Sequence, residues 1–285
     1  FTMGTANAIV TANFDPLQYR IILTSSNTTM GSVSGGGTYD YNTSRSIYAT
    51  PKSGYKFMQW SDGVTTASRN IRLISDTSLV AEFDYQYYTL TTRVNSVERG
   101  TVTSGGSVPY TQIKELVAIP NYGYVFKNWT VSGAGSSLSS TRSNPTLFTM
   151  GTENATVTAN FDYDKFDITA IAEQPQMGTV SGSGRYNYLS KQYISAEPGA
   201  RYRFVGWSDG NTENPRSITI TQDETYTAIF EQTHAILTVN PSEKNVGTFD
   251  GPGLYEVGEK VFLQANPAPY YRFVKWSDGS TQNPR

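Results

Sequence analysis

A six-residue aromatic stretch, Tyr-x-Phe-x-x-Trp, recurs four times and constrains the fold more than any other feature. It occupies 55–60, 124–129, 202–207 and 271–276, and it contains all four tryptophans of the 285-residue chain. Successive copies are separated by 69, 78 and 69 positions, and a fixed period of this size indicates a tandem repeat. We therefore predict one small aromatic core per repeat, built from these residues: Trp60, Trp129, Trp207, Trp276, Phe57, Phe126, Phe204, Phe273, Phe83, Phe161 and Phe230.

The same period sets the predicted domain boundaries. Residues 1–15 differ from residues 148–162 at only two positions, so we interpret them as the C-terminal end of a preceding repeat, with its last strand over 10–14. A short repeat follows at 16–86, a long one at 87–162, a second short one at 163–232 and a truncated one at 233–285. Because the chain begins and ends within repeats, we expect it to be part of a longer polypeptide.

Each repeat has the pattern of several short strands. The opening run alternates apolar and polar positions, as at Ile21 and Leu23, and a Gly-Ser/Thr-Val/Phe stretch with clustered glycines then predicts a short strand and a tight turn. The next strand ends at a proline, nine residues before the tryptophan in every copy. The closing strand has one apolar face, as at Leu79, Ala81 and Phe83, which is typical of a strand with one face on a core. We predict a mainly β tandem array of compact domains of ~70 residues.

The position of the tryptophan within its strand has more than one interpretation. In an unbroken strand the tyrosine and phenylalanine share one face and the tryptophan lies on the other. Either both faces are covered, or a β-bulge turns the tryptophan inward. An exposed tryptophan that serves as a ligand platform is a third, less favoured interpretation.

Two loops could carry chemistry. Ser-Asp-Gly follows three of the tryptophans and predicts a tight turn, and residues 209–214 also place oxygen-bearing side chains at alternate positions, as calcium loops do. The first copy, at 62–67, keeps the turn with fewer such oxygens, and the second copy has Thr-Val-Ser at 130–132 with no acid, which argues against a metal. The long repeat carries a Ser/Gly-rich insertion around 133–140, which we interpret as an extended hairpin tip. Such a loop can hold a binding function, although a tolerated insertion is the simpler interpretation.

Composition excludes several classes of function. Lys plus Arg is 22 and Asp plus Glu is 24, so there is no basic excess to neutralise phosphates and we expect no nucleic-acid partner. No apolar run approaches the ~18 residues of a membrane span. The chain has no cysteine and one histidine, His234, and no pair of acids recurs among the repeats. We therefore expect no catalytic residues, no cofactor and no metal site.

The order of these motifs resembles the divergent internalin-type B-repeat family, which is similar to the Listeria–Bacteroides repeats. Gly-Trp-Ser-Asp-Gly at 206–210 and Thr-Ala-Ile-Phe at 227–230 carry the resemblance most fully, and it extends over the whole chain. The long repeat departs most, since it lacks Ser-Asp-Gly. The resemblance implies a small β-grasp-like unit, strung in tandem in exported bacterial surface proteins.

These observations lead to two hypotheses of function. The first is a non-catalytic stalk or spacer of a large bacterial cell-surface adhesin or surface filament, extracellular, forming an extended rod in which neighbouring repeats are the partners. The alternative is a multivalent array that binds an extracellular glycan or protein receptor. The alternative would use exposed tyrosines and tryptophans or the enlarged loop of 130–147, and burial of all four tryptophans would remove its best residues.

Overall fold

The computed structural model describes all residues, 1–285, and divides into two compact units, 1–162 and 163–285. Every regular element is a β-strand, and the structure has no helix with the length and apolarity needed to cross a bilayer. Repeats 1 to 4 denote the predicted segments 16–86, 87–162, 163–232 and 233–285. Repeats 1 and 2 lie in the first unit, and repeats 3 and 4 in the second.

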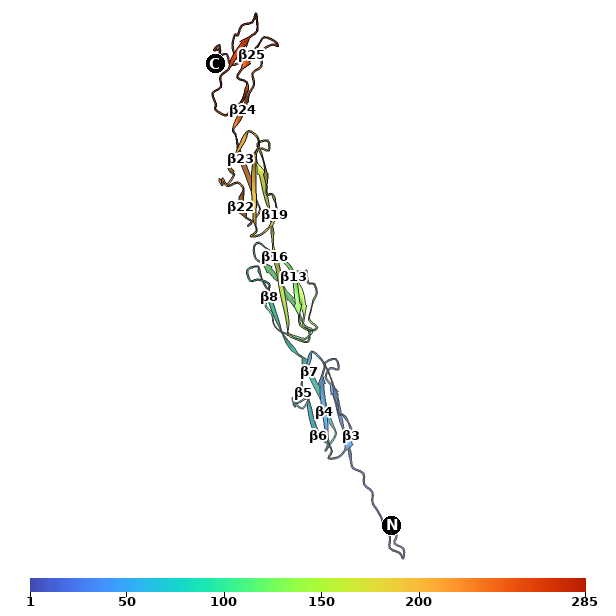
Figure 1. The fold of residues 1–285 in the computed structure, drawn as a ribbon. Helices are drawn as coiled ribbons and strands as arrows, with labels where there is room; N and C mark the ends of the chain where they lie inside the picture. Colours follow the sequence, from blue (N-terminus) through green and yellow to red (C-terminus); the bar gives the residue numbers. More distant parts are fainter. The chain divides into compact units, whose positions relative to one another are not determined.

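Repeat 1 consists of two β-layers (Figure 1). A mixed sheet has the order β3-β1-β7-β5, and an antiparallel sheet has the order β2-β4-β6. The first and last strands, β1 and β7, are parallel neighbours at the centre of the mixed sheet, which is in keeping with the β-grasp-like expectation. The strands are β1 (Gln18–Ser25), β2 (Gly31–Ser34), β3 (Gly37–Asp40), β4 (Ser44–Pro51), β5 (Tyr55–Trp60), β6 (Ser68–Arg72) and β7 (Thr77–Tyr85).

The core of repeat 1 lies between the two layers. Alternate residues of the central strands point into it, so that Ile21 on β1 and Leu79 and Ala81 on β7 are at most 5% exposed. The second layer contributes its own alternate positions, Ile47 and Ala49 on β4. The period-2 pattern of the sequence therefore corresponds to one face on the core and one in water.

Repeat 2 has the same two layers, with sheets β10-β8-β16-β13, β11-β15-β14 and β12-β9. Its counterpart of β4 is interrupted at Val117, whose N–H donates to Thr103 Oγ1 at 2.9 Å. The strands are β8 (Tyr87–Val94), β9 (Gly100–Val102), β10 (Gly106–Pro109), β11 (Ile113–Leu116), β12 (Ala118–Pro120), β13 (Tyr124–Ser132), β14 (Ser137–Leu138), β15 (Thr146–Thr149) and β16 (Ala155–Tyr163).

The insertion of repeat 2 is part of the sheet, so the prediction of an extended hairpin tip is wrong. Its residues form a turn after β13 and the short strand β14, which pairs with β15. Leu138 packs against the core, and Thr146, only 3% exposed, is hydrogen bonded to the carbonyl of Ser140 at 2.7 Å. The sequence suggested a projecting loop because serine and glycine are also typical of flexible tips.

Repeats 3 and 4 make up the second unit. Repeat 3 repeats the plan of repeat 1, with sheets β19-β17-β23-β21 and β18-β20-β22, whereas repeat 4 has two hairpin-like pairs, β24-β26 and β25-β27. The strands are β17 (Lys165–Ala172), β18 (Gly178–Ser181), β19 (Gly184–Asn187), β20 (Lys191–Pro198), β21 (Tyr202–Trp207), β22 (Arg216–Thr219), β23 (Glu224–Gln232), β24 (His234–Leu237), β25 (Gly247–Asp250), β26 (Gly253–Glu256) and β27 (Gln264–Pro267).

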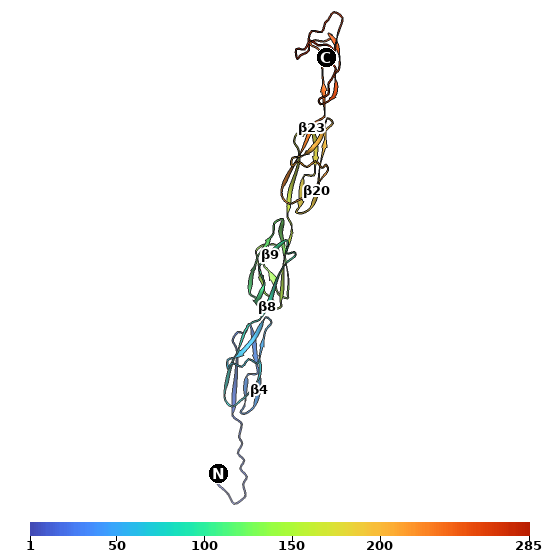
Figure 2. The same cartoon turned by 90° about the vertical axis from the view of Figure 1, so that its left-hand side faces the viewer.

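Two predicted strands do not form. Residues 1–17 contain no strand (Figure 2). Val10 and Phe14 are 68% and 89% exposed. Residues 271–276 of repeat 4, the counterpart of β5, also form no strand. In repeats 1 and 3 the closing strand and the tryptophan strand pair with each other. Each segment that fails to form corresponds to one half of such a pair and is in no sheet of the structure, so its backbone groups join no ladder.

Candidate functional site: the tryptophan turn and the joint between repeats

A β-bulge decides where the tryptophans point. The register between β5 and β7 shifts between Phe57 and Gln59, and that between β21 and β23 shifts between Phe204 and Gly206. A bulge adds one residue to a strand, so the tryptophan joins the phenylalanine on the inner face. The rings of Phe57 and Trp60 lie 5.7 Å apart between centroids.

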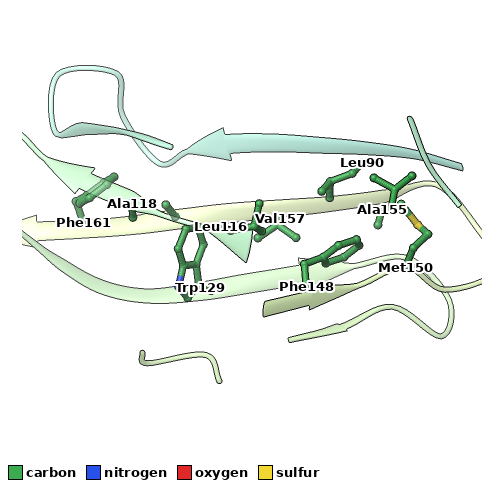
Figure 3. Close-up of a cluster of buried hydrophobic side chains, with 11 residues drawn as sticks. Leu90, Leu116, Ala118, Trp129, Phe148, Met150, Ala155, Val157 and Phe161 are labelled. Carbon is green, nitrogen blue, oxygen red and sulfur yellow. The ribbon is translucent and has the colours of Figure 1, made fainter. Parts of the chain in front are cut away.

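The tryptophans of repeats 1 to 3 are among the most buried side chains of the protein. Trp60, Trp129 and Trp207 are at most 1% exposed. Figure 3 shows Trp129 within a cluster that includes Leu116, Phe148 and Phe161. Because three of the four indoles are enclosed, they cannot offer a face to a ligand.

The phenylalanines of the predicted core occupy two levels of burial. Phe161 and Phe230 are buried, at 1% and 5% exposure. The remaining ones in repeats 1 to 3 are partly buried against the same clusters: Phe57, Phe83, Phe126 and Phe204. In repeat 4, Phe273 and Trp276 contact each other at 5.1 Å but are only half-buried, since no closing strand covers them.

A single hydrogen-bonded turn recurs after each tryptophan. We define the tryptophan turn as residues 60–67, 129–144, 207–214 and 276–283. The indole Nε1–H donates to a backbone carbonyl within the turn in all four copies, at 2.9 to 3.1 Å, with these acceptors: Thr66, Ser143, Glu213 and Gln282. The backbone N–H of each tryptophan also donates into the turn, at 2.7 to 2.8 Å. The indole therefore anchors the turn as well as filling the core.

Glycine and aspartate close the short form of this turn. Gly63, Gly210 and Gly279 have φ between 84° and 88°, a conformation that glycine adopts without strain. The aspartate before each glycine forms an ion pair with an arginine seven residues later. The distance from guanidinium nitrogen to carboxylate oxygen is 2.6 Å in all three copies: Asp62–Arg69, Asp209–Arg216 and Asp278–Arg285. Hydrogen bonding from Arg216 holds the pKa of the Asp209 carboxyl below its usual value. The carboxylate of the calcium-like sequence is thus engaged with arginine.

An asparagine at the end of the turn was not singled out by the sequence argument. Asn214 Nδ2 donates to the carbonyl of Ala196 at 2.6 Å, and the N–H of Ala196 donates to Asn214 Oδ1 at 2.9 Å. Asn144 and Asn283 form the same pair of bonds with Ala118 and Ala265. The side chain thereby imitates a paired strand. An Asn-Pro dipeptide that recurs in three of four repeats was the available signal.

A one-residue joint links neighbouring repeats within each unit. Gln86 separates β7 from β8; its N–H donates to the carbonyl of Gly54, and its carbonyl accepts from the N–H of Tyr110, both at 2.9 Å. Thr233 separates β23 from β24 and makes the equivalent bonds with Arg201 and Val257, at 2.8 and 2.9 Å. The joint residue is thus bonded to the repeat before it and to the repeat after it.

Aromatic contacts add to the joint between repeats 1 and 2. The ring of Tyr55 lies edge-on to that of Tyr110, with 5.3 Å between centroids, and 5.5 Å from that of Tyr85. Gly54 makes this approach possible, because a Cβ there would lie 2.3 Å from the ring of Tyr110. The sequence predicted short connections, but the bonds and ring contacts depend on the folded neighbours.

The core and the tryptophan turn recur among the repeats, and the joint recurs between them. These features define a tandem β-repeat protein. The chain belongs to the divergent InlB B-repeat domain family, whose model matches residues 21–86, 89–165, 168–234 and 237–284. The resemblance inferred from the motifs is thereby confirmed. This repeat family is a structural, non-enzymatic domain type associated with bacterial surface proteins.

Comparisons with curated proteins and with solved structures give less information about the chain than the family match does. No curated protein matches the chain. Among solved structures, the chain is similar to the Bacillus anthracis TIE protein, with 10% sequence identity and a TM-score of 0.33. The match covers 73% of this chain and 49% of that one, so the chain spans about half the length of that protein.

Proposed function

We propose that this array is a non-catalytic spacer, a stalk segment of a bacterial cell-surface adhesin or filament. The observation that carries the proposal is the parallel pairing of the first and last strand of each complete repeat. The chain enters such a repeat at one end of the central pair and leaves it at the opposite end. Each repeat therefore advances the chain by about the length of a strand of eight or nine residues, about 30 Å.

The joints support the same role. A single residue between strands, bonded on both sides, leaves little freedom for one repeat to fold back on the next. The partners of each repeat in this proposal are its neighbours along the chain. Trp60, Trp129 and Trp207 are buried and Ser137–Leu138 of the insertion pair with β15, so the ligand-binding alternative is left mainly with exposed tyrosines such as Tyr48 and Tyr193.

Small-angle X-ray scattering tests the proposal. Four repeats of about 30 Å placed end to end form a rod of about 120 Å with a radius of gyration near 35 Å. A compact globule of the same length has a radius of gyration of about 19 Å, and the unfolded chain about 60 Å. A value near 19 Å, independent of concentration, would exclude a spacer.

A further inference from the structure

We propose that the parallel strand pair is a mechanical clamp, so that the array resists tension as well as supplying length. This inference rests on the proposed stalk function, because a stalk holds a distal part against pulling forces. Tension along the chain enters a repeat at the start of its first strand and leaves at the end of its last strand. In a parallel pair the start of the first strand and the end of the last strand lie at opposite ends of the pair. Tension therefore shears the two strands past each other, and all the hydrogen bonds between them bear the force at the same time.

The same ladder occurs in all three complete repeats. β1 and β7, β8 and β16, and β17 and β23 are each paired in parallel over five positions. These strands are at the centre of their sheets, flanked on both sides. Their inward residues are buried in the core, as are Ala81, Ala159 and Ala228, all 0% exposed. Water therefore has little access to one side of the bonds that tension would load.

Further hydrogen bonds lengthen the ladder at both ends. At the start of the first strand, an Asp or Asn side chain accepts from the backbone N–H at 2.7 to 2.8 Å, in the pairs Arg20–Asp76, Thr89–Asn154 and Asp167–Asp223. At its end, a backbone N–H donates to the alanine carbonyl of the last strand at 2.9 to 3.1 Å, in the pairs Ser26–Ala81, Asn95–Ala159 and Glu173–Ala228. The side-chain bond at the start of the first strand and the backbone bond at its end both recur in three repeats of different sequence. The fold therefore places these two hydrogen bonds at fixed positions.

Repeat 2 has the most extensive clamp. The side chain of Asn95 makes two more bonds with the backbone of Phe161, donating to its carbonyl at 2.9 Å and accepting from its N–H at 3.1 Å. Ser26, at the equivalent position of repeat 1, makes only one such bond, accepting from the N–H of Phe83 at 3.4 Å. We therefore expect repeat 2 to require the highest force to unfold.

Single-molecule stretching in two directions tests the clamp on the intact chain. The protein has no cysteine, so two introduced cysteines are unique attachment points. Lys165→Cys with Gln232→Cys pulls the two strands of repeat 3 from opposite ends of their pair. Lys165→Cys with Gln222→Cys pulls them from the same end. We expect the first geometry to need at least twice the unfolding force of the second at equal loading rate, and equal forces would overturn the proposal.

Two side-chain variants examine the ladder itself. With the chain pulled through its own termini, Asn95→Ala should remove the highest-force event and leave the other unfolding events unchanged. Asn160→Ala is the matched control, since its half-buried side chain lies on the face of the clamp strand β16 opposite the core and only reaches Thr130 Oγ1 at 3.5 Å. An unchanged force for Asn95→Ala, or an equal loss in the control, would count against the clamp. A chain that scatters as a rod yet unfolds equally easily in both directions would leave the spacer intact and refute the clamp alone.

Discussion

Replacing Asn214 by alanine is the most direct test of how the tryptophan turn is held. The substitution deletes two hydrogen bonds, of 2.6 and 2.9 Å, between the side chain and the backbone of Ala196. Ala196 is 5% exposed, so its N–H and carbonyl on that side lose their partners with little access to water. Leaving a buried polar group unpaired costs about 1–3 kcal/mol, so we expect repeat 3 to lose about 2–4 kcal/mol. A repeat of this size has a total stability of about 4–10 kcal/mol, so the loss is a large fraction of the whole.

Hydrogen exchange followed by mass spectrometry resolves this loss by repeat. The expected change corresponds to a decrease of about 30- to 1,000-fold in the protection of the core amides of repeat 3, since 1.4 kcal/mol is a factor of ten. Peptides from repeat 1 should be unaffected, because that repeat lies in the other unit and has Ala67 at the equivalent position.

Two further variants make the result interpretable. Asn187→Ala changes an exposed asparagine on the edge strand β19, and we expect a change within about 0.5 kcal/mol. Asn214→Asp keeps an acceptor for the N–H of Ala196 but places an oxygen against its carbonyl, so it should destabilise about as much as alanine does. If Asn214→Ala matched the Asn187→Ala control, the asparagine would not hold the turn.

Three other predictions concern the core, the joint and pH. Trp129→Phe loses the indole bond and leaves a cavity, so urea denaturation should show repeat 2 destabilised by about 1–3 kcal/mol; an unchanged midpoint would contradict this. Gly54→Ala should expose the Gln86 and Tyr110 amides to hydrogen exchange, whereas Gly63→Ala, with a similar φ but open space around it, should not affect the joint. Burial, with a hydrogen bond to Glu224, raises the pKa of Tyr226 to about 12. The protonated Tyr226 therefore contributes fully to the stability of repeat 3 below about pH 10, and this contribution is lost as the pH rises toward 12. Absorbance titration should show a late tyrosine ionisation that Tyr226→Phe removes.

The family, the repeat period and the mainly β class follow from the sequence because they depend on local pattern. Alternation of apolar residues identifies strands, proline ends them, and Asp-Gly closes a turn, all through interactions within a few residues. These features required no knowledge of which strands pair.

Pairing between distant residues was decided by the tertiary structure alone. The side on which Trp60 lies depends on a bulge against β7, which the spacing of the aromatic residues left open. The insertion near Leu138 has the composition of a flexible tip but gains a ladder with β15. The parallel contact of first and last strands joins residues more than fifty positions apart, and only the folded chain brings them together.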